Sequence, residues 1–207
     1  MESKRDYRRE LTDIRNMMAK SSRFISLSGL SGIFAGVYAL IGAYVAYEIG
    51  YRKFDLTFYN RLFHPNSRDT VWLVLDGMVI LTLTLATGFF FTQRKAKKDG
   101  LKMWSASTKL LLESMAYPLV SGGLVCLILL NFGLVGLISP LTLVFYGIAL
   151  VSGSSYTFRD IKYLGICEII LGIIATFYLG YGLLFWAIGF GLLHIVYGAF
   201  MYYKYER

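Results

Sequence analysis

The stretch YLGICEIILGIIATFYLGYGLLFWAIGFGLLHIVYGAFMYY, residues 163–203, decides the fold class of this chain. It contains two long apolar runs that together hold a single carboxylate, Glu168, and a single imidazole, His194. A helix needs roughly 17–25 apolar residues to cross the hydrocarbon core of a bilayer, and each run is about that long. Between the runs, Leu179–Gly182 is short and rich in glycine, which is typical of a tight turn. The stretch therefore predicts an antiparallel hairpin of two membrane-spanning helices.

The rest of the chain continues this pattern. Apolar residues make up 56% of the 207 residues and charged ones 16%, against about 45–50% and 25% in soluble chains, which excludes a soluble domain. Lipid offers no backbone partners, and the runs lack the alternation of barrel strands, so each must be helical. We predict one all-α domain over residues 1–207, a polytopic transmembrane bundle of six helices. The predicted spans are about 24–48, 71–92, 118–138, 140–156, 163–179 and 183–203.

Basic residues are distributed unevenly around these spans. Of the 21 Lys and Arg side chains, 17 lie before span one, between spans two and three, after span four or after span six, segments that share one side. The positive-inside rule places that side, and with it both termini, in the cytoplasm. The distribution also explains the net charge of +8 without a nucleic-acid partner. Only four basic residues lie on the other side: Arg52, Lys53, Arg61 and Arg68.

Segments outside the spans carry amphipathic patterns. Residues 1–22 place apolar side chains at helical spacing among many charges, which predicts a cytoplasmic amphipathic helix. This helix could bind a cytoplasmic protein or lie on anionic lipid headgroups beside its own bundle. A second amphipathic helix is expected between spans two and three, where Leu101, Trp104 and Met115 fall near one side. The aromatic loop of residues 51–69 is expected at the opposite interface, where it could cover an opening.

Residues 17–36, MMAKSSRFISLSGLSGIFAG, resemble the opening of a group of small, uncharacterised bacterial polytopic membrane proteins. The resemblance covers about a tenth of the chain. It implies a multi-pass protein of the bacterial cytoplasmic (inner) membrane, and it brings no activity, cofactor or site residue with it.

The first span has a stripe of small residues along one face. Such stripes let helices approach closely in lipid, where apolar association gains little. The stripe predicts tight packing against a neighbouring helix of the same chain or, in a homo-oligomer, of a second copy. A glycine-lined path for a solute is the alternative. The residues of this small-residue stripe are Ser28, Gly32, Ala35, Gly36, Ala39, Gly42 and Ala46.

Three Asp, Glu or His side chains stand well inside the predicted spans: Asp76, Glu168 and His194. A charge at the bilayer centre costs at least about 2.5–3.5 kcal/mol, so each indicates a site or a specific partner. Asp76 is near the outer start of span two, where water or a neighbouring helix could satisfy it. If the hairpin is centred on Tyr181, Glu168 and His194 lie at equal depth, each 13 residues away. We predict that these two face each other and share a proton, either as a functional pair or as a structural bond between helices.

Motifs for enzymatic chemistry are absent: there is no HExxH, GxSxG, Walker or GxGxxG sequence. Two histidines and carboxylates at different depths make a poor ligand set, so no metal or cofactor is predicted. Cys126 and Cys167 both lie in apolar spans, which argues against a disulfide. Two functions remain open. One is a small channel or transporter using Glu168 and His194, and the other is a non-transporting sensor, anchor or regulatory subunit acting through residues 1–22.

Overall fold

The computed structural model describes residues 28–51 and 68–207, and every regular element within them is helical. The last three elements continue one another, so the described chain builds six helical rods, as the sequence predicts. In chain order the elements are α2 (Gly29–Ala46), η1 (Tyr47–Tyr51), α3 (Arg68–Lys98), α4 (Ala106–Asn131), η3 (Val135–Leu137), α5 (Ile138–Gly153), α6 (Ile161–Phe177), η4 (Leu179–Tyr181), α7 (Gly182–Trp186), η5 (Ala187–Leu193) and α8 (His194–Tyr205).

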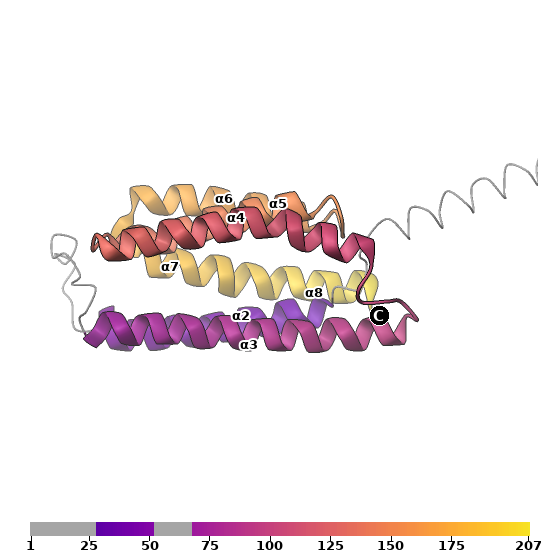
Figure 1. Cartoon of the computed structure of the whole chain (residues 1–207). Coiled ribbons are helices and arrows are strands. Elements are labelled where there is room, and N and C mark those ends of the chain that lie inside the picture. The colour runs from indigo at the N-terminus through magenta and orange to yellow at the C-terminus, as the bar shows by residue number, and fades with distance from the viewer. Residues whose placement is uncertain (1–27, 52–67) are drawn as a thin grey trace, which may run out of the picture.

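The rods run side by side along one axis (Figure 1). α5 packs along both α4 and α6, and these three form one layer. The last rod, α7–η5–α8, lies between that layer and α2, since α7 contacts α5 and α6 while η5 and α8 contact α2. α3 packs on the far part of α2. The last rod therefore occupies the centre of the bundle, with α6 on one side of it and α2 on the other.

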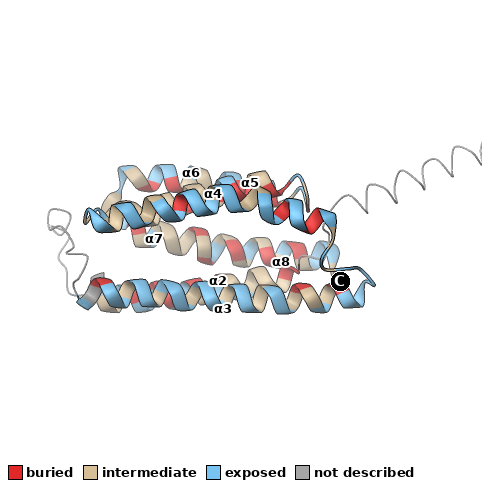
Figure 2. Ribbon diagram, viewed as in Figure 1, coloured by how far each residue is buried: buried red, intermediate tan, exposed pale blue. Residues whose placement is uncertain are grey.

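Five of the rods are long and apolar enough to cross a membrane. α6, with 17 residues, is shorter than these five, but it packs along α5. The pattern of burial is that of a membrane protein, because the buried positions are mostly small residues while many large apolar side chains are exposed. Figure 2 shows exposed positions along the length of α3 and α4. α3 and α4 carry the broadest such faces. In water these faces would be costly, and in lipid they are the expected outer surface.

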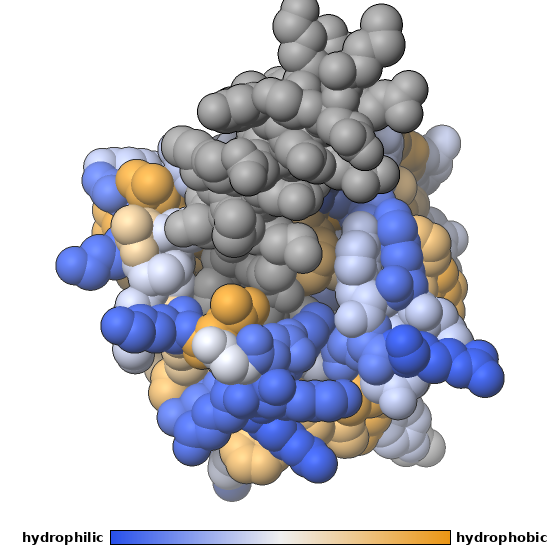
Figure 3. All heavy atoms as spheres, turned by 90° about the vertical axis from the view of Figure 1, so that its right-hand side faces the viewer, coloured by the Kyte–Doolittle hydropathy of each residue, from blue (hydrophilic) through white to orange (hydrophobic). Residues whose placement is uncertain are grey.

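One end of the bundle gathers polar groups. Glu206 accepts hydrogen bonds from the backbone N–H of Gly29 and from Ser28 Oγ, the latter at 3.1 Å, and lies 3.4 Å from Lys95 Nζ. These contacts bring the start of α2 and the end of α3 to the C-terminus. Figure 3 shows hydrophilic side chains spread over this end. We call it the basic end, and its described basic residues are Arg94, Lys95, Lys97, Lys98, Lys102, Lys109, Arg159, Lys162, Lys204 and Arg207.

α4 starts at Ala106, where Ser105 and Thr108 form a capping box, and runs without a break through Pro118. One continuous helix therefore covers the segment before the third predicted span as well as most of that span. The amphipathic helix expected between spans two and three is therefore the first part of α4 itself. Leu101 and Trp104 precede it in an irregular segment.

Several predictions fall outside the described residues. These are the amphipathic helix of residues 1–22, the first residues of span one and most of the aromatic loop of residues 51–69.

Candidate functional site

Glu168 lies on the inner face of α6, and none of its surface is exposed. Small residues bring α6 close to α5 on either side of it. A Cβ atom at Gly165 would lie 2.7 Å from the carbonyl oxygen of Gly147, and one at Gly172 would lie 2.7 Å from that of Pro140. Both distances are shorter than van der Waals contact, so the two backbones approach as closely as glycine allows. This close approach shields the carboxyl from solvent on the α5 side.

His194 faces Glu168 across the hairpin, as the predicted register requires. Its Nδ1 lies 3.4 Å from Glu168 Oε1 and 3.0 Å from the carbonyl oxygen of Gly189, while Nε2 lies 2.9 Å from the Tyr146 hydroxyl. A carbonyl can only accept, so Nδ1 carries a proton and donates it to Gly189. In the neutral ring, Nε2 then accepts from the hydroxyl of Tyr146. The backbone and α5 therefore fix both the tautomer and the orientation of the ring.

The carboxyl of Glu168 has no hydrogen-bond partner among the described residues, at either oxygen. The imidazole N–H that faces it is already donated to Gly189. A buried carboxylate without donors is far more costly than a neutral carboxyl, because nothing replaces the water it has lost. The pair therefore has the distance of a salt bridge without its hydrogen bond. This arrangement favours the protonated, neutral form of the Glu168 carboxyl.

Gly189 shapes the site from the π-helical turn η5. A Cβ at this position would lie 2.5 Å from Glu168 Oε2 and would also overlap Leu143. The position therefore has room for the carboxyl only because it is glycine. π-helical turns are uncommon and are often found at functional sites. Here the turn supplies both the space for Glu168 and the carbonyl that orients His194.

Aromatic rings cover the cluster on the side away from the basic end. Phe190 stacks on His194 with ring centroids 5.8 Å apart, and it also contacts Tyr146 and Trp186, each at 5.0 Å. Phe190 and Trp186 precede His194 by one and two helical turns. They therefore lie between the cluster and the α6–α7 turn. His194 keeps only 6% of its surface exposed.

Asp76 does not join this cluster. It lies on α3, half-buried, with Oδ2 3.4 Å from where a Cβ of Gly42 would stand. α3 packs mainly on α2 and η1, so Asp76 belongs to the contact between α2 and α3.

The small-residue stripe of α2 packs against the chain's own last rod. A Cβ at Gly36 would lie 2.5 Å from the carbonyl oxygen of Gly191, and one at Gly32 would lie 3.1 Å from Gly198 Cα. Farther along, Gly42 faces α3 instead. A homo-oligomer through span one would have to use the other side of α2. Ala39 and Ala46 of the stripe are buried, while Gly32 and Ala35 are half-buried.

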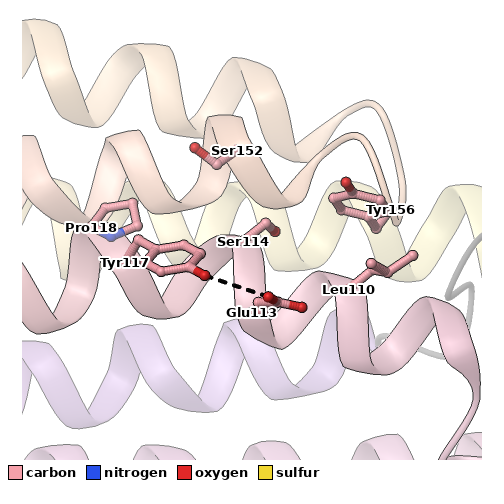
Figure 4. A pocket seen from close by; sticks show the side chains of 7 residues that line it. All are labelled: Leu110, Glu113, Ser114, Tyr117, Pro118, Ser152 and Tyr156. Atoms are coloured by element: carbon pink, nitrogen blue, oxygen red, sulfur yellow. Dashed lines mark hydrogen bonds between the residues drawn. The ribbon is translucent and has the colours of Figure 1, made fainter.

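A separate cavity of about 490 Å³ lies between α4 and the end of α5 (Figure 4). Within it the Tyr117 hydroxyl points at Glu113, 3.4 Å from Oε1. Neither Glu168 nor His194 lines it, so it does not lead to the buried pair. The lining residues are Leu110, Glu113, Ser114, Tyr117, Pro118, Ser152 and Tyr156.

Sequence reasoning missed Tyr146 and Gly189. A tyrosine near the middle of a span is a usable signal, because interfacial tyrosines gather at span ends. Gly189 gave no comparable signal among the many glycines of the spans. Within residues 28–51 and 68–207, no three His, Cys, Asp or Glu side chains come together as metal ligands.

Comparisons with protein-family models, with curated proteins and with solved structures find no match to this chain. Its class therefore follows from fold and composition: it is an all-α membrane-protein bundle with a buried polar cluster of Tyr146, Glu168 and His194.

Proposed function

We propose that this protein is a small membrane transporter or channel that binds and releases protons at Glu168. The observation that supports this most is the fully buried carboxyl, unpartnered within the described chain and 3.4 Å from an imidazole nitrogen. Such a group is costly in a bilayer unless it is used. A proton is the simplest species that this cluster of hydroxyl, imidazole and carboxyl can accept and pass on.

The proposal includes a location in the bacterial inner membrane with both termini in the cytoplasm. Its support is the concentration of basic side chains at one end of the bundle, which the positive-inside rule assigns to the cytoplasm. The resemblance of residues 17–36 to small bacterial membrane proteins supports the choice of membrane.

Proton loss from Glu168 would change the packing of α6 against the last rod. With its proton, the carboxyl fits beside Gly189, and α6 closes on η5. Without it, the buried negative charge has no hydrogen-bond donor free among the described residues, because the nearby Nδ1–H of His194 is donated to Gly189, and water or a cation must enter to stabilise it. Separation of α6 from η5 is the movement that would admit them. Proton binding is thereby coupled to opening of the bundle.

Proton flux into proteoliposomes tests this function. The vesicles contain a pH-sensitive dye, an inward proton gradient is imposed, and valinomycin with K⁺ supplies the counter-charge. We expect the wild type to dissipate the gradient and Glu168→Gln to fail, because the amide cannot carry the proton. Glu113→Gln is the matched control, since it makes the same change at an exposed residue of α4. Wild-type flux through Glu168→Gln would refute the proposal.

A proton-sensing regulatory subunit is the second candidate. The observation that favours it is the burial of the pair: Glu168 has no exposed surface, and only 6% of the surface of His194 is exposed. In this case the wild type gives no flux, yet Trp186, which contacts Phe190 beside His194, changes fluorescence with pH. The change must vanish in Glu168→Gln.

The other two tryptophans, Trp72 and Trp104, are exposed and can be replaced by phenylalanine so that Trp186 reports alone. Deletion of residues 1–20 would then release any cytoplasmic partner of the sensor. Flux that survives this deletion would favour the transporter.

A further inference from the structure

We propose that protons reach Glu168 from the basic end of the bundle, along the side chains of Tyr197, Tyr146 and His194. This inference rests on the proposed function, because it assigns a route to the proton that Glu168 binds. In this proposal Tyr146 and Tyr197 are relay residues, and the side of the site toward the α6–α7 turn is closed to protons.

The inner part of the route is a continuous set of contacts. The Tyr146 hydroxyl lies 2.9 Å from Nε2 of His194, and Nδ1 of the same ring lies 3.4 Å from Glu168 Oε1. A proton can therefore enter the imidazole at one nitrogen and leave at the other. Tyr146 comes from α5, His194 from α8 and Glu168 from α6, so three rods converge on this segment.

The outer part of the route begins at the α5–α6 loop. Asp160 accepts a hydrogen bond of 2.7 Å from the Tyr205 hydroxyl and one of 2.8 Å from Lys204 Nζ. These hydrogen bonds, first that from Lys204, hold the pKa of Asp160 below its usual value of 3.8. The group is half-buried at the basic end and stays ionised at neutral pH. It is placed to collect protons from bulk water.

Tyr197 stands between the two parts. It lies about one turn after His194 on α8 and two turns before Tyr205, which spans about 12 Å at 1.5 Å per residue. Its hydroxyl oxygen is buried and has no hydrogen-bond partner among the described residues. A buried hydroxyl left unbonded is unusual, and each instance calls for an explanation.

Packing connects Tyr197 to the inner part of the route. Tyr197 and Tyr146 pack against the same apolar cluster of Leu150, Ile161 and Leu164. A relay explains why a hydroxyl is kept at this position.

On the opposite side, the described residues next to His194 are aromatic. Toward the α6–α7 turn, His194 is followed by Phe190 and then by Trp186, whose rings are in contact. Leu143 and Leu171 close the space beside Gly189. Protons move poorly through such an apolar plug, because nothing in it can hold them.

The transfer conserves charge along the route. Tyr146 gives its hydroxyl proton to His194 Nε2 and recovers one from Tyr197 through a bridging water, because the Tyr197 hydroxyl has no hydrogen-bond partner among the described residues. Tyr197 recovers its own proton from the basic end in the same way. The imidazole then gives its Nδ1 proton to the Glu168 carboxylate. Each relay group gains one proton and loses one, so only Glu168 changes its charge.

Infrared measurement of hydrogen exchange at Glu168 tests the route without relying on flux. The difference between wild type and Glu168→Gln in proteoliposomes isolates the carbonyl stretch of the protonated carboxyl. On transfer to D₂O this band shifts, and its rate reports proton access. We expect Tyr197→Phe to slow the shift roughly tenfold or more, equivalent to about 1.4 kcal/mol in the barrier.

Tyr203→Phe is the matched control, since Tyr203 lies on the same helix and is 65% exposed. It should exchange at the wild-type rate. Exchange at the wild-type rate in Tyr197→Phe would overturn the route. If the wild type shows the infrared band of the protonated Glu168 carboxyl but no proton flux, the transport function is refuted. The exchange rate of Tyr197→Phe relative to the wild type still decides the route in that case. Absence of the band at every pH would overturn both.

Discussion

Substitution of Gly36 by alanine tests the packing that holds α2 to the last rod. The added Cβ would lie 2.5 Å from the carbonyl oxygen of Gly191, 2.6 Å from Ile195 Cγ1 and 3.0 Å from Ile195 N. Ordinary contact begins near 3.4 Å, so α2 must move away by roughly 1 Å. Two of the three atoms are backbone and cannot turn aside. Overpacking of this kind costs about 1–3 kcal/mol.

Gly88→Ala on α3 is the control for the change in helix propensity. A Cβ at Gly88 meets nothing within 4 Å, so the substitution adds a methyl group at an open surface. Alanine is the better helix former by up to about 1 kcal/mol. We therefore expect Gly88→Ala to be neutral or stabilising, and Gly36→Ala to be at least about 1 kcal/mol less stable than the wild type.

Both variants can be compared by reversible unfolding in mixed micelles of increasing SDS content, followed by far-UV circular dichroism. The free energy of unfolding is read from the midpoint and slope. Equal stability of Gly36→Ala and Gly88→Ala would show that the stripe of α2 does not pack on η5 and α8 as described. A loss of stability that depends on protein concentration would instead assign the stripe to a homo-oligomer.

Three further predictions concern single interactions. The pKa of Asp160 is lowered in the folded state, so its ion pair stabilises the fold above about pH 3.8, and this stabilisation is lost as the pH falls through the lowered folded value. In thermal unfolding, the wild type should therefore be about 0.2–1 kcal/mol more stable than Asp160→Asn at about pH 5, and this difference should shrink as the pH falls below 3.8. Tyr146→Phe leaves Nε2 of His194 unpaired and should lower the free energy of unfolding by about 1–3 kcal/mol in denaturant titrations. Ser105→Ala removes the capping box of α4 and should cost about 0.5–2 kcal/mol, with faster amide exchange confined to the first turn.

The rods were predictable because each is a long apolar run bounded by charge or glycine. The facing of Glu168 and His194 was predictable too, because a short turn fixes the register of a hairpin and depth follows by counting from Tyr181. The continuity of α4 through Pro118 was harder to predict, because a proline usually interrupts a helix, whereas here one helix runs from the capping box at Ser105 to Asn131.

Contacts between rods that are far apart in the sequence could not be predicted from sequence patterns. Tyr146 lies 48 residues from His194, and no turn links their depths or their rotation about the helix axes. The side of α2 that meets the last rod was visible as a stripe, but its partner was not, because small residues occur on several spans. The π-helical turn was equally hidden, since its sequence AIGFGLL suits an ordinary helix.

Gly189 is the residue where the fold and the candidate site depend on each other most directly. If the Nδ1–H of the neutral His194 ring were donated to Glu168, this hydrogen bond would stabilise the ionised carboxylate. The carbonyl of Gly189 takes that donor instead, at 3.0 Å, and its missing side chain admits the carboxyl. The neutral, protonated form of Glu168 is then the stable one. Loss of that proton leaves a charge that only water, a cation or movement of α6 away from η5 can relieve, so the same glycine that closes the hairpin also makes its closure depend on protonation.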